Sequence, residues 1–305
     1  MEKITLGKSK LEVPVIAVGC MRINSLSKVD AEKFVQTALD EGANFFDHAD
    51  IYGSGTCEEI FSEAVHMNDD VREKIIVQSK CGIRKGMFDF SKEHIINSVN
   101  LSLKRLKTDY LDVLLLHRPD ALVEPEEVAE AFDELESSGK VKYFGVSNQK
   151  PMQIELLRKY VKQPIVANQL QLSITNANMI SNGINVNMEI DSSIDRDGSI
   201  LDYCRLNDIT IQPWSPFQYG FFEGVFLENE KFPKLNKKID EIAEKYNVTN
   251  TTIVVAWLLR HPAKMQPIVG TMNIDRLKDC CRATDIRLTR EEWYEIYRSA
   301  GNKLP

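Results

Sequence analysis

Residues 111–146 read LDVLLLHRPDALVEPEEVAEAFDELESSGKVKYFGV and contain a complete strand–helix–strand unit. Leu111–Leu116 is apolar enough to be buried on both faces, as the strands of a parallel sheet are. Pro125–Ser138 is a predicted helix, with a proline at its start and Gly139 just beyond its end. Val141–Val146 is the next predicted strand. Two strands joined by a helix predict a parallel pair with the helix packed outside.

The same alternation runs along the whole chain. The predicted strands are Val15–Val18, Asn44–Asp47, Lys74–Ser79, Leu111–Leu116, Val141–Val146, Ile165–Leu170, Thr210–Trp214 and Gln266–Val269. Each is followed by at least one predicted helix, which favours a closed (β/α)₈ TIM barrel over an open sheet. Two helices at the end of the chain, Ile274–Cys281 and Arg290–Ala300, follow the last strand. Ahead of the first strand, Ile4–Leu6 and Leu11–Val13 predict a β-hairpin that plugs the bottom of the barrel.

Composition narrows the class of protein. The chain has 305 residues, of which 43% are hydrophobic, and a formal net charge of −7. No linker or charge block divides it, so we expect one domain over residues 1–305. An acidic chain lacks the basic face that binding to nucleic acid or anionic membranes needs. The longest apolar run, Ile253–Leu259, is far short of a membrane span. With no signal peptide in the sequence and no cysteine framework, we expect a cytoplasmic protein.

The residues that follow the strands predict where the chemistry lies. In a (β/α)₈ barrel the strand-to-helix loops form the active face. Asp47 and Tyr52 follow the second strand, Lys80 follows the third and His117 follows the fourth. A carboxylate and a lysine that end apolar strands are costly to bury unless they pair. Taken singly, Asp47 and Lys80 could also be a purely structural ion pair.

These residues resemble the motifs of the aldo-keto reductase family, in its bacterial YdhF-like branch. The family's D-x-A-x-x-Y-G motif is present as Asp47–Gly53, and its lysine matches Lys80. Its histidine in L-L-H matches His117, and its G-x-S-N motif matches Gly145–Asn148. The resemblance covers essentially the whole chain. It implies NADPH-dependent reduction of aldehydes and ketones to alcohols, with a small-molecule carbonyl compound as substrate.

The chemistry of carbonyl reduction suits these four side chains. Hydride transfer to a carbonyl leaves an alkoxide that needs a proton from a nearby acid. The resemblance makes Tyr52 the donor, although a free tyrosine has a pKa of about 10. A lysine cation about 4 Å away would lower that pKa by roughly three units before desolvation opposes it. We therefore expect Lys80 to acidify Tyr52, Asp47 to hold Lys80 charged, and His117 to orient the carbonyl.

The resemblance also implies an extended NADP(H) molecule across the rim of the barrel. Gly53-Ser54-Gly55 lacks the third glycine of a dinucleotide fingerprint and is not taken as one. Trp214 is expected to stack on the nicotinamide ring, and Arg276 to meet the 2′-phosphate at a helix start. The implied cofactor-binding residues are Gly19, Met21, Asp47, Ser147, Asn148, Gln169, Trp214, Ser215, Phe217, Gly270, Thr271 and Arg276.

Three positions depart from the common family pattern. His48 stands where many members have serine or threonine, and we expect it to change the polarity of the pocket. Trp214 replaces a tyrosine and still offers a flat ring. Gly270 replaces a lysine, which leaves Arg276 as the main phosphate partner and weakens the preference for NADP over NAD.

Two other classes of function stay open from the sequence. A metal-dependent hydrolase would use Asp47, His48, Asp50 and His117 as ligands, but it leaves Lys80 and Tyr52 unexplained, and no metal site is predicted. A cofactor-binding interaction protein of the same fold would bind without turnover. The substrate and the oligomeric state are not predicted.

The regions expected to border the substrate are three segments and one long loop. The segments are Arg118–Glu124, Gln218–Pro233 and the short tail Gly301–Pro305, and the loop between Ser173 and Ser199 could cover part of the rim. The short tail predicts an open pocket that accepts many aldehydes and ketones. Gln218–Phe222 could supply an aromatic wall.

Overall fold

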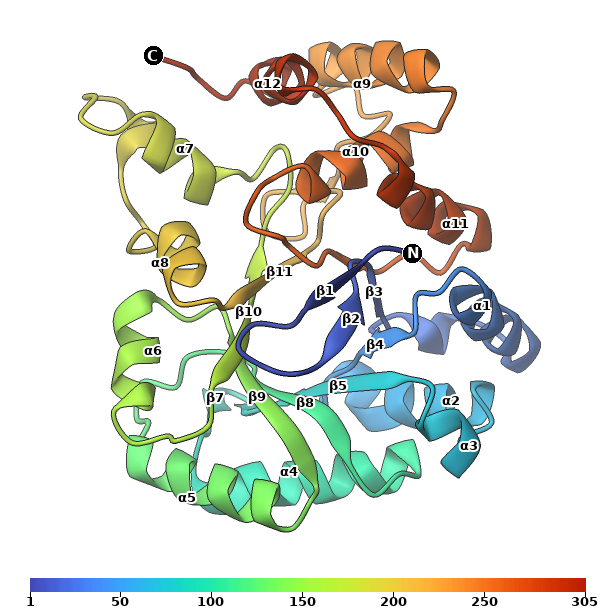
Figure 1. The fold of residues 1–305 in the computed structure, drawn as a ribbon, viewed down its shortest axis with the longest axis vertical. Helices are drawn as coiled ribbons and strands as arrows, with labels where there is room; N and C mark the ends of the chain where they lie inside the picture. The colour runs from blue at the N-terminus through green and yellow to red at the C-terminus, as the bar shows by residue number, and fades with distance from the viewer.

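The computed structural model describes residues 1–305 and contains the predicted TIM barrel (Figure 1). Its parallel strands, in spatial order, are β11 (Thr210–Trp214), β10 (Ile165–Gln171), β9 (Val141–Ser147), β8 (Leu111–Leu116), β5 (Ile76–Cys81), β4 (Phe45–Asp47), β3 (Ala17–Gly19) and β14 (Ile268–Val269). The backbone N–H of Gln266 donates a hydrogen bond of 3.0 Å to the carbonyl of Ile211, which joins the two ends of this sheet. The barrel is therefore nearly closed.

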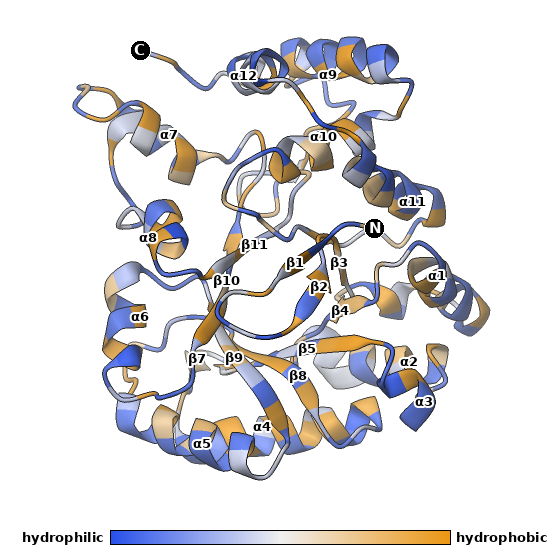
Figure 2. Ribbon diagram, in the orientation of Figure 1, coloured by the Kyte–Doolittle hydropathy of each residue, from blue (hydrophilic) through white to orange (hydrophobic).

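Helices surround the strands and turn their polar faces outward (Figure 2). Most follow a strand in the chain, as the alternation predicts, and lie on the outer side of the sheet. Their bounds are α1 (Lys28–Asp40), α2 (Thr56–Ala64), α3 (Asp69–Arg72), α4 (Lys92–Leu106), α5 (Pro125–Ser137), α6 (Pro151–Arg158), α7 (Asn178–Ile184), α8 (Ile200–Leu206), α9 (Pro233–Tyr246), α10 (Asn250–Leu259), α11 (Ile274–Arg282) and α12 (Arg290–Ser299).

The N-terminal hairpin, β1 (Lys3–Thr5) with β2 (Glu12–Pro14), lies against the barrel interior. Leu6 and Val13 are fully buried in one apolar cluster with residues of the barrel strands. Gly7 has a φ of +51°, and a Cβ there would come within 2.2 Å of the carbonyl oxygen of Val166. Only glycine fits this approach without displacing a barrel strand. The predicted plug is confirmed.

Helix α10 packs deeply between its neighbours. It is apolar on every side, and Trp257 on it stacks on Trp293 of α12 with ring centres 4.8 Å apart. Each indole N–H donates to the backbone carbonyl of the other tryptophan, so neither polar group is left unpaired. No helix in the protein is both long enough and apolar enough to cross a membrane.

Several short elements differ from the sequence expectation. The loop expected between Ser173 and Ser199 contains α7 and a turn of 3₁₀ helix at Asp191–Ser193. Two hairpins were not predicted, namely β6 (Ile83–Arg84) with β7 (Met87–Phe88) and β12 (Gln218–Tyr219) with β13 (Gly224–Val225). Elements this short carry no periodicity and depend on tertiary contacts. The last barrel strand is also shorter than predicted and starts at Ile268.

Candidate active site

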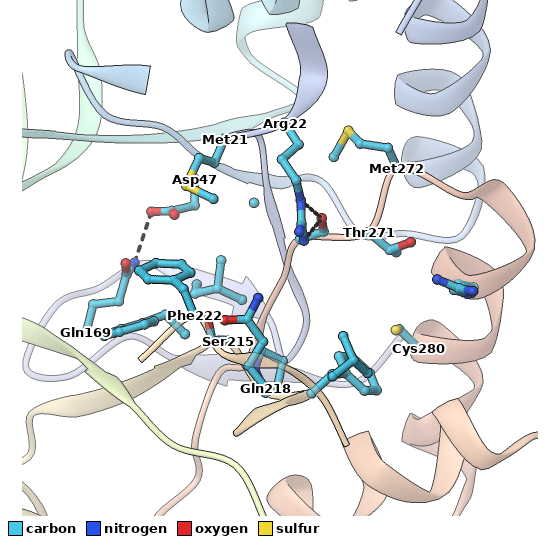
Figure 3. Close-up of a pocket in the computed structure, with 18 of the residues that line it drawn as sticks. Met21, Arg22, Asp47, Gln169, Ser215, Gln218, Phe222, Thr271, Met272 and Cys280 are labelled. Carbon is cyan, nitrogen blue, oxygen red and sulfur yellow. Dashed lines mark hydrogen bonds between the residues drawn. The ribbon is translucent and has the colours of Figure 1, made fainter. Parts of the chain in front are cut away.

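A cavity of about 1040 Å³ opens at the carboxyl ends of the barrel strands (Figure 3). Asp47, Tyr52 and His117 line it, as does every residue that the sequence analysis assigned to the cofactor. Those cofactor positions are Gly19, Met21, Asp47, Ser147, Asn148, Gln169, Trp214, Ser215, Phe217, Gly270, Thr271 and Arg276. The parallel strands bring these distant segments together because all their carboxyl ends meet at one rim.

Lys80 lies behind the cavity wall and contacts three oxygen atoms. Its Nζ donates to Asp47 Oδ2 at 2.8 Å, to the backbone carbonyl of His48 at 2.7 Å and to Tyr52 Oη at 3.1 Å. The Lys80 side chain is fully buried and that of Asp47 is 3% exposed. Burial opposes the charged form, but Asp47 and Tyr52 together outweigh it and raise the Lys80 pKa. Lys80 is thus a cation aimed at the Tyr52 hydroxyl.

The pKa of Tyr52 corrects one expectation. We expected Lys80 to lower it, whereas in the structure it is raised. Burial of the phenol is the largest cause, and the opposing effect of Lys80 is partly cancelled by Asp47. Lys80 still favours the ionised phenol, but its effect on the pKa is smaller than that of burial. Tyr52 therefore keeps its proton at neutral pH, as a proton donor must.

The imidazole ring of His117 lies next to the phenol ring of Tyr52. The two rings lie edge to face, with centres 6.0 Å apart. Burial, followed by the cations Lys80 and Arg118, lowers the pKa of His117 well below its usual value. The imidazole is therefore neutral at pH 7. Its Nδ1 has no hydrogen-bond partner in the protein.

A buried network of glutamines is hydrogen-bonded to the Asp47 carboxylate. Asp47 Oδ1 accepts from Gln78 Nε2 at 2.6 Å and from Gln169 Nε2 at 3.0 Å. Gln212 bonds to both of these amides and to Gln266, and Gln266 Nε2 reaches the carbonyl of Pro14 in the N-terminal hairpin. Strand register places Gln78 beside Asp47 and Gln212 beside Gln169. The sequence analysis missed this network, although an inward glutamine on successive strands was a visible signal.

Asn148 and Trp214 are fixed to each other at the same rim. The Trp214 indole N–H donates to Asn148 Oδ1 at 3.0 Å, and Asn148 Nδ2 donates to Ser147 Oγ at 2.7 Å. Phe222 stacks on Trp214 at 5.8 Å, and Phe221 meets it edge to face. The aromatic wall expected within Gln218–Phe222 is therefore present.

The opposite side of the cavity carries a cation that the sequence analysis missed. Arg22 follows β3, and its guanidinium donates two hydrogen bonds to the carbonyl of Gly270, at 2.6 and 3.1 Å (Figure 3). A Cβ on Gly270 would lie 3.1 Å from Arg22 Nη2, so the glycine leaves room for this contact. Arg276, on the first turn of α11, lines the same end of the cavity. Arg22 belongs to no recognised motif, and only the fold brings it to Gly270.

Three expectations about the surroundings of the cavity were wrong. His48 points into the core instead of the pocket, where it packs on Phe61 with ring centres 4.5 Å apart. The segment 174–198 does not line the cavity, and it borders a separate hollow of about 280 Å³. The tail Gly301–Pro305 does not reach the cavity either, because Asn302 and Lys303 are hydrogen-bonded to Ile174 and Asn185.

The ligand set of the hydrolase alternative is not assembled. The structure brings no three His, Cys, Asp or Glu side chains together in an arrangement that could hold a metal ion. Asp47 is instead occupied by Lys80 and the two glutamines.

Comparison with known proteins agrees with the geometry. The aldo/keto reductase family model matches residues 15–300. The oxidoreductase YdhF of Escherichia coli is 32% identical over 100% of both chains, and a 6-dehydroglucose reductase of Agrobacterium fabrum is 32% identical over 99% of both. A crystal structure of a thermostable aldo-keto reductase, solved with the inhibitor epalrestat, covers 98% of this chain and 100% of its own, with 26% identity and a TM-score of 0.79. The chain is an oxidoreductase of the aldo/keto reductase family.

Proposed function

We propose that this protein reduces aldehydes and ketones to alcohols with NADPH. The observation that carries the proposal is the contact of the Lys80 ammonium with both Asp47 and the Tyr52 hydroxyl at the wall of the cavity. A protonated tyrosine that faces a cation is suited to giving up its proton when an alkoxide forms beside it.

The cavity fits an extended dinucleotide. It offers the flat ring of Trp214 at one side and two arginines, Arg22 and Arg276, at the other. Asn148 and Gln169 would hold the carboxamide, while Thr271 and the start of α11 would meet phosphate through backbone N–H groups. When bound there, the cofactor supplies the hydride.

The residues of the chain then handle the proton and the charge. Tyr52 donates its proton to the carbonyl oxygen, and Lys80 stabilises the tyrosinate that remains. Asp47 keeps Lys80 protonated and in place. Neutral His117 hydrogen-bonds the carbonyl oxygen and orients it toward Tyr52. A neutral imidazole suits this role, because its N–H can donate to the carbonyl oxygen while Tyr52 supplies the proton.

Arg22 supports a preference for NADP over NAD. It provides, from the neighbouring strand, a cation near the position where Gly270 carries none. Together with Arg276 it gives the phosphate end two guanidinium groups, which can bind a phosphate in a forked geometry. The missing lysine at position 270 is thereby offset.

The test is a titration with NADPH followed by addition of an activated neutral aldehyde, 4-nitrobenzaldehyde. We expect quenching of tryptophan fluorescence on binding and then loss of the NADPH absorbance. Binding without turnover of any aldehyde would favour the cofactor-binding interaction protein. No binding would refute both of these functions.

A further inference from the structure

Arg118 is a cation in the cavity that the catalytic arrangement does not use. It follows His117 directly, on the loop between β8 and α5, and its side chain is half-buried. Its guanidinium carbon lies 5.5 Å from the centre of the Trp214 ring and 6.0 Å from that of Phe221. These two rings hold the guanidinium by cation–π attraction.

The guanidinium of Arg118 has no acidic partner. Lys80 is paired with Asp47, and Arg22 is bonded to the carbonyl of Gly270, whereas Arg118 forms no ion pair and donates no hydrogen bond within the protein. Burial lowers its pKa, and the Tyr52 hydroxyl is the one group that opposes this shift. Burying a charge without a partner is costly. A protein that keeps such a group in its cavity has a guanidinium free to bind a ligand.

Arg118 follows a different barrel strand from the arginines of the proposed phosphate end. In the order of the eight barrel strands, β8 is fourth and β14 is eighth, so the two stand on opposite sides of the ring. Arg276 follows β14 and Arg22 follows its neighbour β3, whereas Arg118 follows β8. The loop that carries Arg118 therefore starts on the opposite side of the ring from Arg22 and Arg276, directly after His117, and its guanidinium reaches the ring of Trp214.

The charges around Arg118 favour an anion. Three arginines line the cavity, Arg22, Arg118 and Arg276, against the carboxylates of Asp47 and Glu228. Arg22 and Arg276 are assigned to the cofactor phosphates and Asp47 is paired with Lys80, which leaves Arg118 as the cation available to an anionic substrate. Field lines in such a cavity concentrate anions from solution.

We infer that Arg118 binds a carboxylate on the carbonyl substrate, so that the preferred substrates are aldehydes or ketones that also carry a carboxylate group. This inference rests on the proposed reductase function and names its substrate class. The planar guanidinium offers a carboxylate two parallel hydrogen bonds. The aromatic side chains of Phe221 and Phe222, which line the cavity, cover the apolar body of the substrate. The carbonyl then lies toward His117 and Tyr52.

The experiment compares 4-carboxybenzaldehyde with benzaldehyde, which differ in charge but have carbonyl groups of similar intrinsic reactivity, because an ionised para carboxylate withdraws little electron density. The wild-type protein should have the higher kcat/KM for the carboxylate. In Arg118→Gln the ratio of the two kcat/KM values should fall by about 10-fold to 100-fold, as expected for loss of a charge-assisted pair. Arg118→Lys keeps the charge without the fork and should recover part of the ratio.

A matched control is Arg84→Gln on strand β6. Arg84 is paired with Asp89 and does not line the cavity, so both substrates should react as in the wild type. Glyceraldehyde, a neutral hydroxyaldehyde, tests whether Arg118 binds hydroxyl groups instead.

Four outcomes would overturn the inference. The first is a wild-type protein that turns over the neutral aldehyde without favouring the carboxylate, and the second is an equal loss of kcat/KM for both benzaldehydes in Arg118→Gln. The third is a loss of kcat/KM for glyceraldehyde in Arg118→Gln as large as that for the carboxylate. The fourth is weaker NADPH binding in Arg118→Gln. Absence of turnover of every aldehyde would instead refute the proposed function itself.

Discussion

Asp47→Asn separates the electrostatic role of Asp47 from its shape. The substitution keeps the size of the side chain but removes the charge 2.8 Å from Lys80 Nζ. At that distance, and with an effective dielectric constant near 20, the lost attraction is about 6 kcal/mol. Part of this loss is recovered because Lys80 can give up its proton. Breaking a buried pair on one side costs about 3–5 kcal/mol, which for a chain of this size lowers Tm by roughly 5–8 °C.

The pH dependence makes the prediction specific. In the wild type the Lys80 pKa is raised, so the stability from this pair is fully present at neutral pH and is lost only as the pH rises through that raised pKa. In Asp47→Asn, burial without a carboxylate should depress the Lys80 pKa. The unfolded chain then binds more protons than the folded one, so stability should rise with pH between about 7 and 10.

A second buried pair provides the control. Asp112 bonds to Arg72 at 2.6 Å, and both side chains are 5% exposed. Arginine does not deprotonate in proteins, and Lys142, which also pairs with Asp112 at 3.2 Å, is half exposed so that water can solvate its charge. Asp112→Asn should therefore lower Tm with little gain in stability at higher pH. Urea unfolding of both variants from pH 7 to pH 10 measures the difference. If Asp47→Asn loses stability to the same extent at every pH, Lys80 stays charged without Asp47 and our explanation of the pair is wrong.

Three further changes test other parts of the structure. Gln212→Leu should lower the free energy of unfolding by about 1–3 kcal/mol because it leaves the buried amide oxygens of Gln78 and Gln266 without a donor, whereas exposed Gln36→Leu should change it by less than about 0.5 kcal/mol in urea unfolding. Arg22→Gln should weaken NADPH binding by about 10-fold in fluorescence titrations but weaken NADH binding much less. An equal effect on both cofactors would show that Arg22 does not bind the 2′-phosphate. Burial lowers the pKa of His48 to about 3, so the wild type should lose about 1.4 kcal/mol of stability per pH unit, relative to His48→Leu, as the pH falls from 6 to 4. A constant difference between those two proteins would show that His48 is not buried in its neutral form.

The barrel was predictable because its signals are local and repeated. Leu111–Leu116 has the same bounds in the structure as in the prediction. The residues around the cavity were predictable for a related reason. Once the strands are placed, their carboxyl ends must meet, so Asp47, Tyr52 and His117 had to converge.

The features of the site that the sequence did not predict depend on side-chain direction and on contacts between distant loops. His48 is next to Asp47, but successive residues near the end of a strand point to opposite sides, and His48 points at Phe61. The bond between Arg22 and Gly270 joins residues 248 positions apart. The raised pKa of Tyr52 depends on desolvation, which requires knowing how deeply the hydroxyl is buried.

Tyr52→Phe tests the proton donor most directly. The substitution removes one oxygen atom and leaves Lys80 paired with Asp47. We predict that the turnover of 4-nitrobenzaldehyde, followed by NADPH absorbance, falls by about 10²-fold to 10⁴-fold, while NADPH affinity in a fluorescence titration stays within about twofold. Reduction at a near-normal rate would show that Tyr52 does not supply the proton.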